Sequence, residues 1–148
     1  MRLSNITRAV AILSTLAMAL ALALPALGGG RPLSADLTGD NEVPPSGSAA
    51  TGTANFTLNQ GQGEICADIV SSGYAEGEVI VAGHIHRGGA GAVNPPLVDF
   101  FVTSPNHSMC VDVESALVKE IRQNPGDFYF NLHSNFTPGG VIRGQLSR

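Results

Sequence analysis

The sequence carries little positive charge. Only 8 of its 148 residues are Lys or Arg, against 12 Asp and Glu residues, which gives a formal net charge of −4. The basic residues are scattered, so no stretch of the chain resembles the basic segments that bind the phosphate backbone of nucleic acids. The sequence therefore predicts no nucleic-acid partner.

Long apolar runs are also absent after residue 28. The one such run, at residues 9–24, follows Arg2 and Arg8 and ends before Pro25 and small residues. This order is typical of a secretory signal peptide, and we expect residues 1–28 to be one. A retained membrane anchor is the alternative, but the run is short for a span. We therefore expect a mature chain without a membrane span, secreted to the periplasm or the extracellular space.

Cysteine is scarce, with two residues in the whole chain, Cys66 and Cys110. An even pair in an exported protein predicts a disulfide bond. Both cysteines fall on the polar side of segments in which apolar and polar residues alternate. They could thus join two neighbouring strands, and two unpaired small residues are the alternative. No cysteine lies near the expected cleavage site, so a lipoprotein anchor is not indicated.

Motifs of known catalytic centres are missing as well. The chain has no Gly-x-Ser-x-Gly segment and no phosphate-binding loop. The adjacent His133 and Ser134 do not make a triad, because no positioned acid or oxyanion donor accompanies them. The sequence gives no catalytic residue, and an enzyme is the least favoured interpretation.

Short segments with alternating apolar and polar residues follow one another along the mature chain, separated by turn residues. Only residues 114–123 show helical spacing, through Leu117, Val118 and Ile121. The pattern predicts an all-β fold: an antiparallel Greek-key β-sandwich, immunoglobulin-like or superoxide-dismutase-like, with one short helix. A sheet closed on itself is the alternative. The expected strands are residues 31–37, 50–58, 64–70, 78–86, 97–103, 108–113, 128–133 and 141–146.

Three of the four histidines lie in two of these segments. Side chains on a strand alternate between its two faces, so His84 and His86 share one face. The same count places Val79, Val81 and Ile85 on the opposite, apolar face. If residues 78–86, 128–133 and 141–146 join one sheet, they form a polar surface. Its expected members are His84, His86, Tyr129, Asn131, His133, Arg143 and Gln145.

This histidine set allows two kinds of site. Three imidazoles on neighbouring strands suit a zinc or copper ion, which makes His84, His86 and His133 candidate metal ligands. The favoured interpretation is a hydrogen-bonded network in which the histidines bond with Asn131, Arg143 and Glu42, and which fastens the N-terminal loop to the sheet. The cationic Arg143 disfavours a metal ion beside it. The cofactor therefore stays open, with copper and zinc as the candidates.

Three motifs connect the chain to a known family. They are N-E-V-P-P at residues 41–45, G-H-I-H at 83–86 and P-G-G-V-I-R-G-Q-L at 138–146. Together they make the chain similar to the CHRD (chordin-type) domain family over residues 31–148. Gly83 departs from the usual alanine of the family, and Val141 stands where an acid is frequent. The resemblance implies an extracellular β domain and brings no settled activity.

These observations lead to one expectation and one alternative. The first is a secreted CHRD-like domain that acts as a binding or structural module, with an extracellular or cell-surface protein or a small ligand as its partner. The alternative is a copper- or zinc-binding protein that uses the three histidines, with redox chemistry as a further option.

Overall fold

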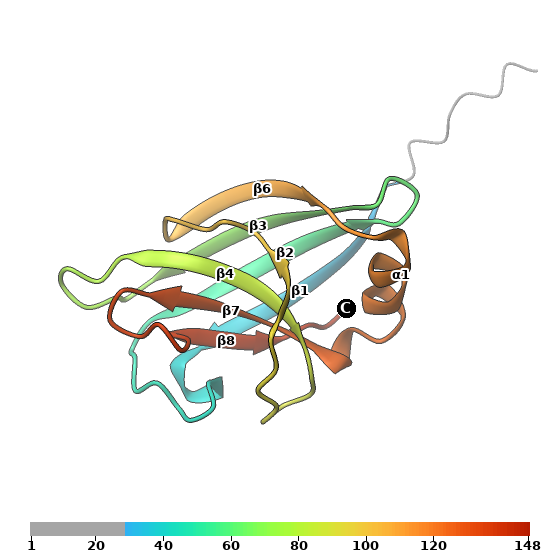
Figure 1. The fold of residues 1–148 in the computed structure, drawn as a ribbon. Coiled ribbons are helices and arrows are strands. Elements are labelled where there is room, and N and C mark those ends of the chain that lie inside the picture. Colours follow the sequence, from blue (N-terminus) through green and yellow to red (C-terminus); the bar gives the residue numbers. More distant parts are fainter. Residues whose placement is uncertain (1–28) are drawn as a thin grey trace, which may run out of the picture.

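The computed structural model describes residues 29–148 (Figure 1). Residues 1–28, the expected signal peptide, lie outside this part of the chain. Within it, no helix combines the length and the apolar character needed to cross a membrane.

The described residues form eight strands and one α-helix, so the predicted all-β fold with one short helix is confirmed. Each predicted segment is present with small shifts at its ends, apart from the fifth strand. That strand stops at Asp99 because Phe101 adopts a positive φ of 49°, which is incompatible with an extended strand. The elements are β1 Arg31–Thr38, β2 Thr51–Asn59, β3 Glu64–Ser72, β4 Ile80–Arg87, β5 Pro96–Asp99, β6 Asn106–Asp112, α1 Ser115–Gln123, β7 Phe128–Ser134 and β8 Ile142–Gln145, with 3₁₀ turns at Gly39–Asn41 and Pro125–Asp127.

All eight strands belong to one antiparallel sheet in the order β5-β4-β7-β8-β1-β2-β3-β6. The sheet folds over on itself at the short β8–β1 pairing, where Thr38 is opposite Arg143. Gly144 allows this approach, since a Cβ atom there would overlap the carbonyl oxygen of Asp36. The two halves of the sheet therefore face each other and enclose the core (Figure 1).

Aromatic rings join the two halves across this core. Phe56 of β2 contacts Phe130 of β7, with ring centroids 5.3 Å apart, and Phe100, with centroids 5.8 Å apart. All three rings are buried, and each contributes roughly 1.5–3 kcal/mol through burial. Helix α1 adds Val118 and Ile121, which are fully buried and cover one end of the core.

One part of the face assignment in β4 is wrong. Val79 and Val81 were expected beside Ile85 on the apolar face, but they are 54% and 49% exposed. The pairing with β7 shifts register between Ile80 and Ala82, and this β-bulge changes which face each side chain takes. Ile80 occupies the core position in their place, whereas Ile85 is buried as predicted.

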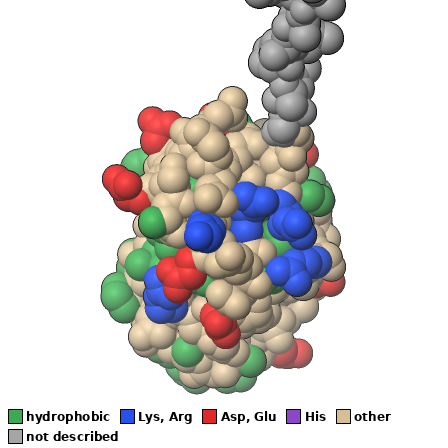
Figure 2. Space-filling model, turned by 90° about the vertical axis from the view of Figure 1, so that its right-hand side faces the viewer, with side chains coloured by type: hydrophobic (Ala, Val, Ile, Leu, Met, Phe, Trp, Pro, Cys, Tyr) green, Lys and Arg blue, Asp and Glu red, His purple; other side chains and the backbone are tan. Residues whose placement is uncertain are grey.

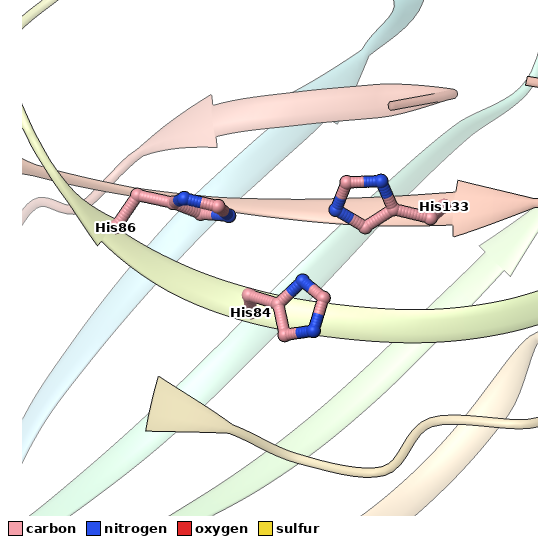
Figure 3. Close-up of side chains that lie close together, drawn as sticks. All are labelled: His84, His86 and His133. Carbon is pink, nitrogen blue, oxygen red and sulfur yellow. The ribbon is translucent and has the colours of Figure 1, made fainter. Parts of the chain in front are cut away.

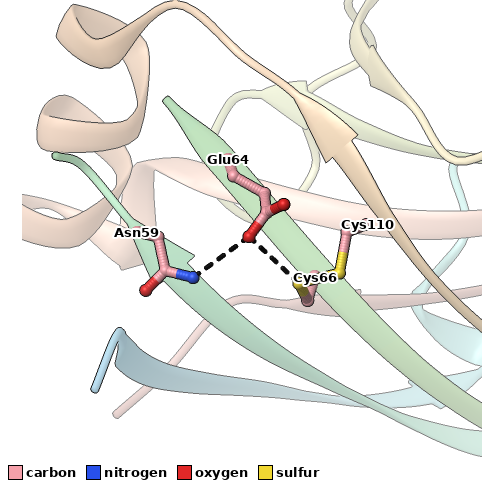
Figure 4. The surroundings of a disulfide bond; sticks show 4 residues. All are labelled: Asn59, Glu64, Cys66 and Cys110. Carbon is pink, nitrogen blue, oxygen red and sulfur yellow. Dashed lines mark hydrogen bonds between the residues drawn. A yellow bond between two sulfur atoms is a disulfide. The ribbon is translucent and has the colours of Figure 1, made fainter. Parts of the chain in front are cut away.

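The predicted disulfide is confirmed. Cys66 of β3 lies directly opposite Cys110 of β6, and the two sulfur atoms are bonded (Figure 4). The bond fastens the edge strand β6 to the rest of the sheet. The Glu64 carboxylate lies beside the bridge and accepts a hydrogen bond of 3.2 Å from the side-chain nitrogen of Asn59 (Figure 4).

Candidate functional site: the three-histidine cluster

Two neighbouring strands carry the three histidines. His84 and His86 project from β4, and His133 projects from β7, which pairs with β4 so that Ala82 is opposite His133 and His84 is opposite Asn131. The alternation of side chains places all three rings on one face of the sheet, away from the core. Figure 3 shows the rings gathered around a common space. The ring centroids of His84 lie 5.6 Å from His86 and 4.9 Å from His133.

One ring nitrogen of each histidine points into this space (Figure 3). The three nitrogens lie within 4.8 Å of one another. A zinc ion bound to all three at about 2.0–2.1 Å would hold them roughly 3.4 Å apart in a tetrahedral arrangement. The nitrogen atoms would therefore need to approach one another by up to about 1.4 Å to share an ion.

The outer nitrogens face oxygen atoms. The Nδ1 atom of His86 lies 2.7 Å from the carbonyl oxygen of Asn94, and Nδ1 of His133 lies 2.9 Å from that of Pro138. Since a carbonyl oxygen only accepts hydrogen bonds, both Nδ1 atoms carry the proton. In a neutral ring, the inward Nε2 atom then carries the lone pair. Histidines that ligate metals usually have such an outer acceptor, which fixes the tautomer.

His84 follows the same pattern less tightly. Its Nε2 atom lies 3.8 Å from the carboxylate of Asp99, which is opposite it in the β4–β5 pairing. Its Nδ1 atom is buried and has no hydrogen-bond partner among the described residues. Burial lowers the pKa of His84, and the neighbouring His133 lowers it further. Burial also lowers the pKa of His133. Both rings are therefore neutral at pH 7, the form that can bind a metal ion.

Asn131 connects the cluster to Glu42. The side-chain oxygen atom of Asn131 lies 2.9 Å from Nε2 of His86 and 3.1 Å from Nε2 of His133. With both protons on Nδ1, these Nε2 atoms need donors, and rotating the amide by 180° exchanges its oxygen and nitrogen and supplies them. The amide oxygen then faces the Glu42 carboxyl, in place of the nitrogen that donates to this carboxyl before the rotation.

Glu42 fits this arrangement as a neutral acid. Burial raises its pKa to about 7, although the positive charge of Arg143 and the hydrogen bonds from Asn131 and the Val43 backbone oppose the rise. Its Oε1 atom is buried without a partner, and once the amide is turned, a protonated carboxyl can donate to the Asn131 oxygen in place of accepting from the Asn131 nitrogen. Asn131 thus connects Glu42 to His86 and His133 by hydrogen bonds.

Arg143 contacts the ring system through Tyr129 and makes no hydrogen bond to the histidines. The Tyr129 ring stacks on His86, with planes 1° apart and centroids 4.7 Å apart. The Arg143 guanidinium lies 3.3 Å from the centroid of the Tyr129 ring and donates to the carbonyl oxygens of Ala92 and Gly89 at 2.6 and 3.2 Å. The expected hydrogen bonds between Arg143 and the histidines are therefore absent from the described structure.

The predicted polar residues do share one face, but that face is largely covered. The loop after β4 lies over it, held by Arg143 and by Gln145, which donates to the carbonyl oxygen of Gly88 at 2.7 Å. As a result His86, Asn131 and Arg143 are only 5%, 3% and 3% exposed. The polar face is therefore half-buried, and solvent reaches it mainly beside His84 and His133.

Sequence reasoning missed the outer oxygen atoms. Asp99 faces His84 through the β4–β5 pairing, which shifts register between Ile85 and His86, and no pattern in the sequence marks that register. The carbonyl groups of Asn94 and Pro138 belong to loops, where the path of the backbone decides the contact. The glycine- and proline-rich composition of both segments predicts loops without indicating where their carbonyl groups point.

A second group with the spacing of metal ligands consists of Glu64, Cys66 and Cys110. Thiolates are the form of cysteine that binds metal ions, and both sulfur atoms here are bonded to each other. The histidine cluster is therefore the better candidate site within residues 29–148.

Comparison with known proteins gives one result that bears on identity. The family model described as CHRD domain matches residues 33–146, which is nearly all of the described chain. No curated protein and no solved structure was found to match the chain. The match covers the N-terminal loop with Glu42, the histidine strand and the closing strand with Arg143, and the chain thus belongs to the CHRD domain family.

Proposed function

We propose that this protein is exported and acts outside the cytoplasm as a binding module, with the three-histidine cluster as its ligand site. Membership of a family that is generally extracellular supports export. The disulfide between Cys66 and Cys110 also fits an oxidising compartment. The observation that carries the binding site is the buried and unpartnered Nδ1 atom of His84, which lies beside two other inward-facing imidazoles.

Export is tested by producing the full chain in cells and separating the compartments. We expect a product that begins near residues 26–30 to be found outside the cytoplasm, with its two cysteines oxidised. N-terminal sequencing and thiol labelling measure both properties. A full-length product retained in the cytoplasm with free thiols would contradict the proposal.

A divalent transition metal ion, copper or zinc, is the ligand that the cluster favours. The specific support is the arrangement of hydrogen bonds: His86 and His133 donate outward to carbonyl oxygens, and His84 has Asp99 on its outer side. Each ring therefore carries an inward lone pair, which for His86 and His133 a metal ion would take over from the Asn131 amide. Arg143 keeps its positive charge, but its donors point to the carbonyl oxygens of Ala92 and Gly89, and the Tyr129 ring lies between it and His86.

Equilibrium dialysis of purified residues 29–148 against copper or zinc tests this ligand. We expect one ion per chain, lost in the variant His84→Ala/His86→Ala and retained in His107→Ala, which removes the fourth histidine on the distant strand β6. Circular dichroism checks that each variant is folded. Equal metal content in all three proteins, or none in any, would contradict a metal site. A lowered melting temperature of the His84→Ala/His86→Ala variant without any metal would instead favour a structural network.

A further inference from the structure

The fold collects most of its free positive charge in one place. Of the six basic side chains in residues 29–148, Arg87 pairs with Glu120 and Arg143 is buried against carbonyl groups. The other four are Arg31, Lys119, Arg122 and Arg148, and all four line a single cavity of about 510 Å³. Figure 2 shows this cluster of basic side chains on the face beside α1. None of the four forms an ion pair within the described residues.

This cavity is part of a longer groove. Two further cavities, of about 360 and 390 Å³, adjoin it, and Arg31 and Arg122 line all three. The groove runs between the start of β1, the β2–β3 turn and the end of α1. None of its lining residues is acidic, although the same part of the chain holds twelve acidic residues. We name it the basic groove.

Uncompensated charges of one sign repel each other, and a groove with low-dielectric walls concentrates their field. The Arg148 guanidinium is partly engaged at the end of α1, where its Nη2 atom donates to the carbonyl oxygens of Arg122 and Gln123, both at 3.0 Å. Arg122 donates to the side-chain oxygen of Gln60 at 2.8 Å and leaves its buried Nε atom without a partner. Arg31 and Lys119 remain free to bind an anion.

The other side chains of the basic groove indicate what kind of anion fits. Amide residues make up half of the remaining lining, and an amide offers both a donor and an acceptor, as a sugar hydroxyl requires. None of the exposed large apolar side chains of the described chain lies in the groove, which disfavours insertion into lipid or docking of an apolar peptide. The amide residues are Asn59, Gln60, Gln62, Gln123 and Asn124.

We propose that the basic groove binds an acidic polysaccharide, a sugar chain that bears carboxylate or sulfate groups. Arg31 and Lys119 pair with its charged groups, the amides bond its hydroxyl groups, and the elongated groove accommodates several sugar units. This site uses different residues from the histidine cluster. It goes beyond the proposed function, because it assigns a second ligand site and a ligand class to the protein. Direct binding measured with purified protein does not depend on export or on metal, so a failure here is distinguishable from a failure of those proposals.

Affinity electrophoresis of residues 29–148 in gels that contain polygalacturonate tests the proposal, with neutral dextran in the control gel. We expect retardation by polygalacturonate alone, weakened as the ionic strength rises from 0.01 to 0.15 M, since the screening length falls from about 30 to about 8 Å. Arg31→Gln and Lys119→Gln should each weaken the apparent affinity roughly threefold, as expected for exposed charge pairs. Arg31→Lys should keep the affinity of the unmodified protein for polygalacturonate.

Val81→Glu is the matched control. It changes the net charge by the same amount at an exposed position of β4 outside the groove. At 0.15 M it should leave the affinity within about 1.5-fold of the unmodified protein, because charges more than a screening length of about 8 Å apart interact weakly. Equal weakening by Val81→Glu, or retardation by dextran, would overturn the proposal. A protein that floats with phosphatidylglycerol vesicles and does not bind polygalacturonate would assign the groove to a membrane surface. That result would also overturn the proposal.

Discussion

The imidazoles of His84 and His133 meet at an interplanar angle of 60° with ring centroids 4.9 Å apart, although the two residues lie in strands that are distant in the sequence. Their contact means that a proton on one ring disfavours a proton on the other. Burial acts in the same direction, and the pKa values of both rings are lowered. A pair of neutral imidazoles at neutral pH is therefore built into the sheet.

Acidification should destabilise the fold through this pair. In the unfolded chain these histidines titrate near 6.5, whereas in the folded protein their pKa values are lower. The unfolded state thus takes up protons first, and stability that is present above pH 6.5 is lost as the pH falls below it. Urea unfolding at pH 7.5 and 5.5 measures the loss. The variant His84→Gln/His133→Gln should lose less unfolding free energy between these pH values than the protein with both histidines. Both proteins should carry Glu42→Gln, so that titration of Glu42 does not contribute. An equal loss in the two proteins would contradict the neutral pair.

Glu42 should act on stability in the opposite direction. Its pKa is about 7 in the folded protein and 4.5 in an unfolded chain. The folded state therefore keeps a proton that the unfolded state releases between these values. Stability therefore falls as the pH rises from 4.5 to 7. Between pH 4.5 and pH 8 the unmodified protein should lose roughly 1–3 kcal/mol more unfolding free energy than Glu42→Gln, since one pKa unit corresponds to about 1.4 kcal/mol. Glu76→Gln, at an exposed position, is the charge-matched control and should show no such gain.

Gly83 should not tolerate the alanine that the family pattern favours. A Cβ atom there would lie 2.7 Å from a methyl carbon of Val102 and 2.9 Å from one of Leu132, and both side chains are fully buried. Crowding of this kind usually costs about 1–3 kcal/mol. Gly83→Ala should therefore lower the free energy of unfolding by that amount in urea titrations.

A double-mutant cycle gives the control for Gly83. Val102→Ala removes the closest methyl carbon, so Gly83→Ala should cost at least about 1 kcal/mol less when Val102 is already alanine. Additive effects of the two changes would mean that the space above Gly83 is not filled by Val102.

The disulfide should contribute strongly to stability. It joins residues 44 apart in the sequence, and closing a loop of about this length is worth roughly 4 kcal/mol on the chain-entropy model. Cys66→Ser/Cys110→Ser should lose most of that amount in urea unfolding, and reduction of the unmodified protein should give a similar loss. A loss below about 1 kcal/mol would show that the edge strand β6 is held by other contacts.

The strand pattern and the disulfide could be predicted because both depend on alternation within a strand. Cys66 and Cys110 face each other at the position where parity places them, and His84, His86 and His133 fall on one face for the same reason. Parity fails at the β-bulge of β4, since one extra residue there exposes Val81. A bulge leaves no mark in a sequence of small and β-branched residues.

Features made by loops and by distant segments could not be predicted from the sequence. The loop that covers Arg143 and the carbonyl group of Pro138 that orients His133 depend on the path of the backbone. The basic groove is also made by segments that lie far apart in the sequence. The sequence has no run of basic residues, yet the fold brings Arg31 next to Lys119 and to the C-terminal Arg148.

The most direct test of the histidine site is a nitrogen-15 NMR spectrum of the imidazole side chains, recorded at pH 7.5 before and after one equivalent of zinc. The account predicts the Nδ1–H tautomer for His86 and His133 and the Nε2–H tautomer for His84. It also predicts that zinc shifts the three inward nitrogens and leaves His107 unchanged. A proton on Nε2 of His86 or His133, or three imidazoles that do not respond to zinc, would contradict it.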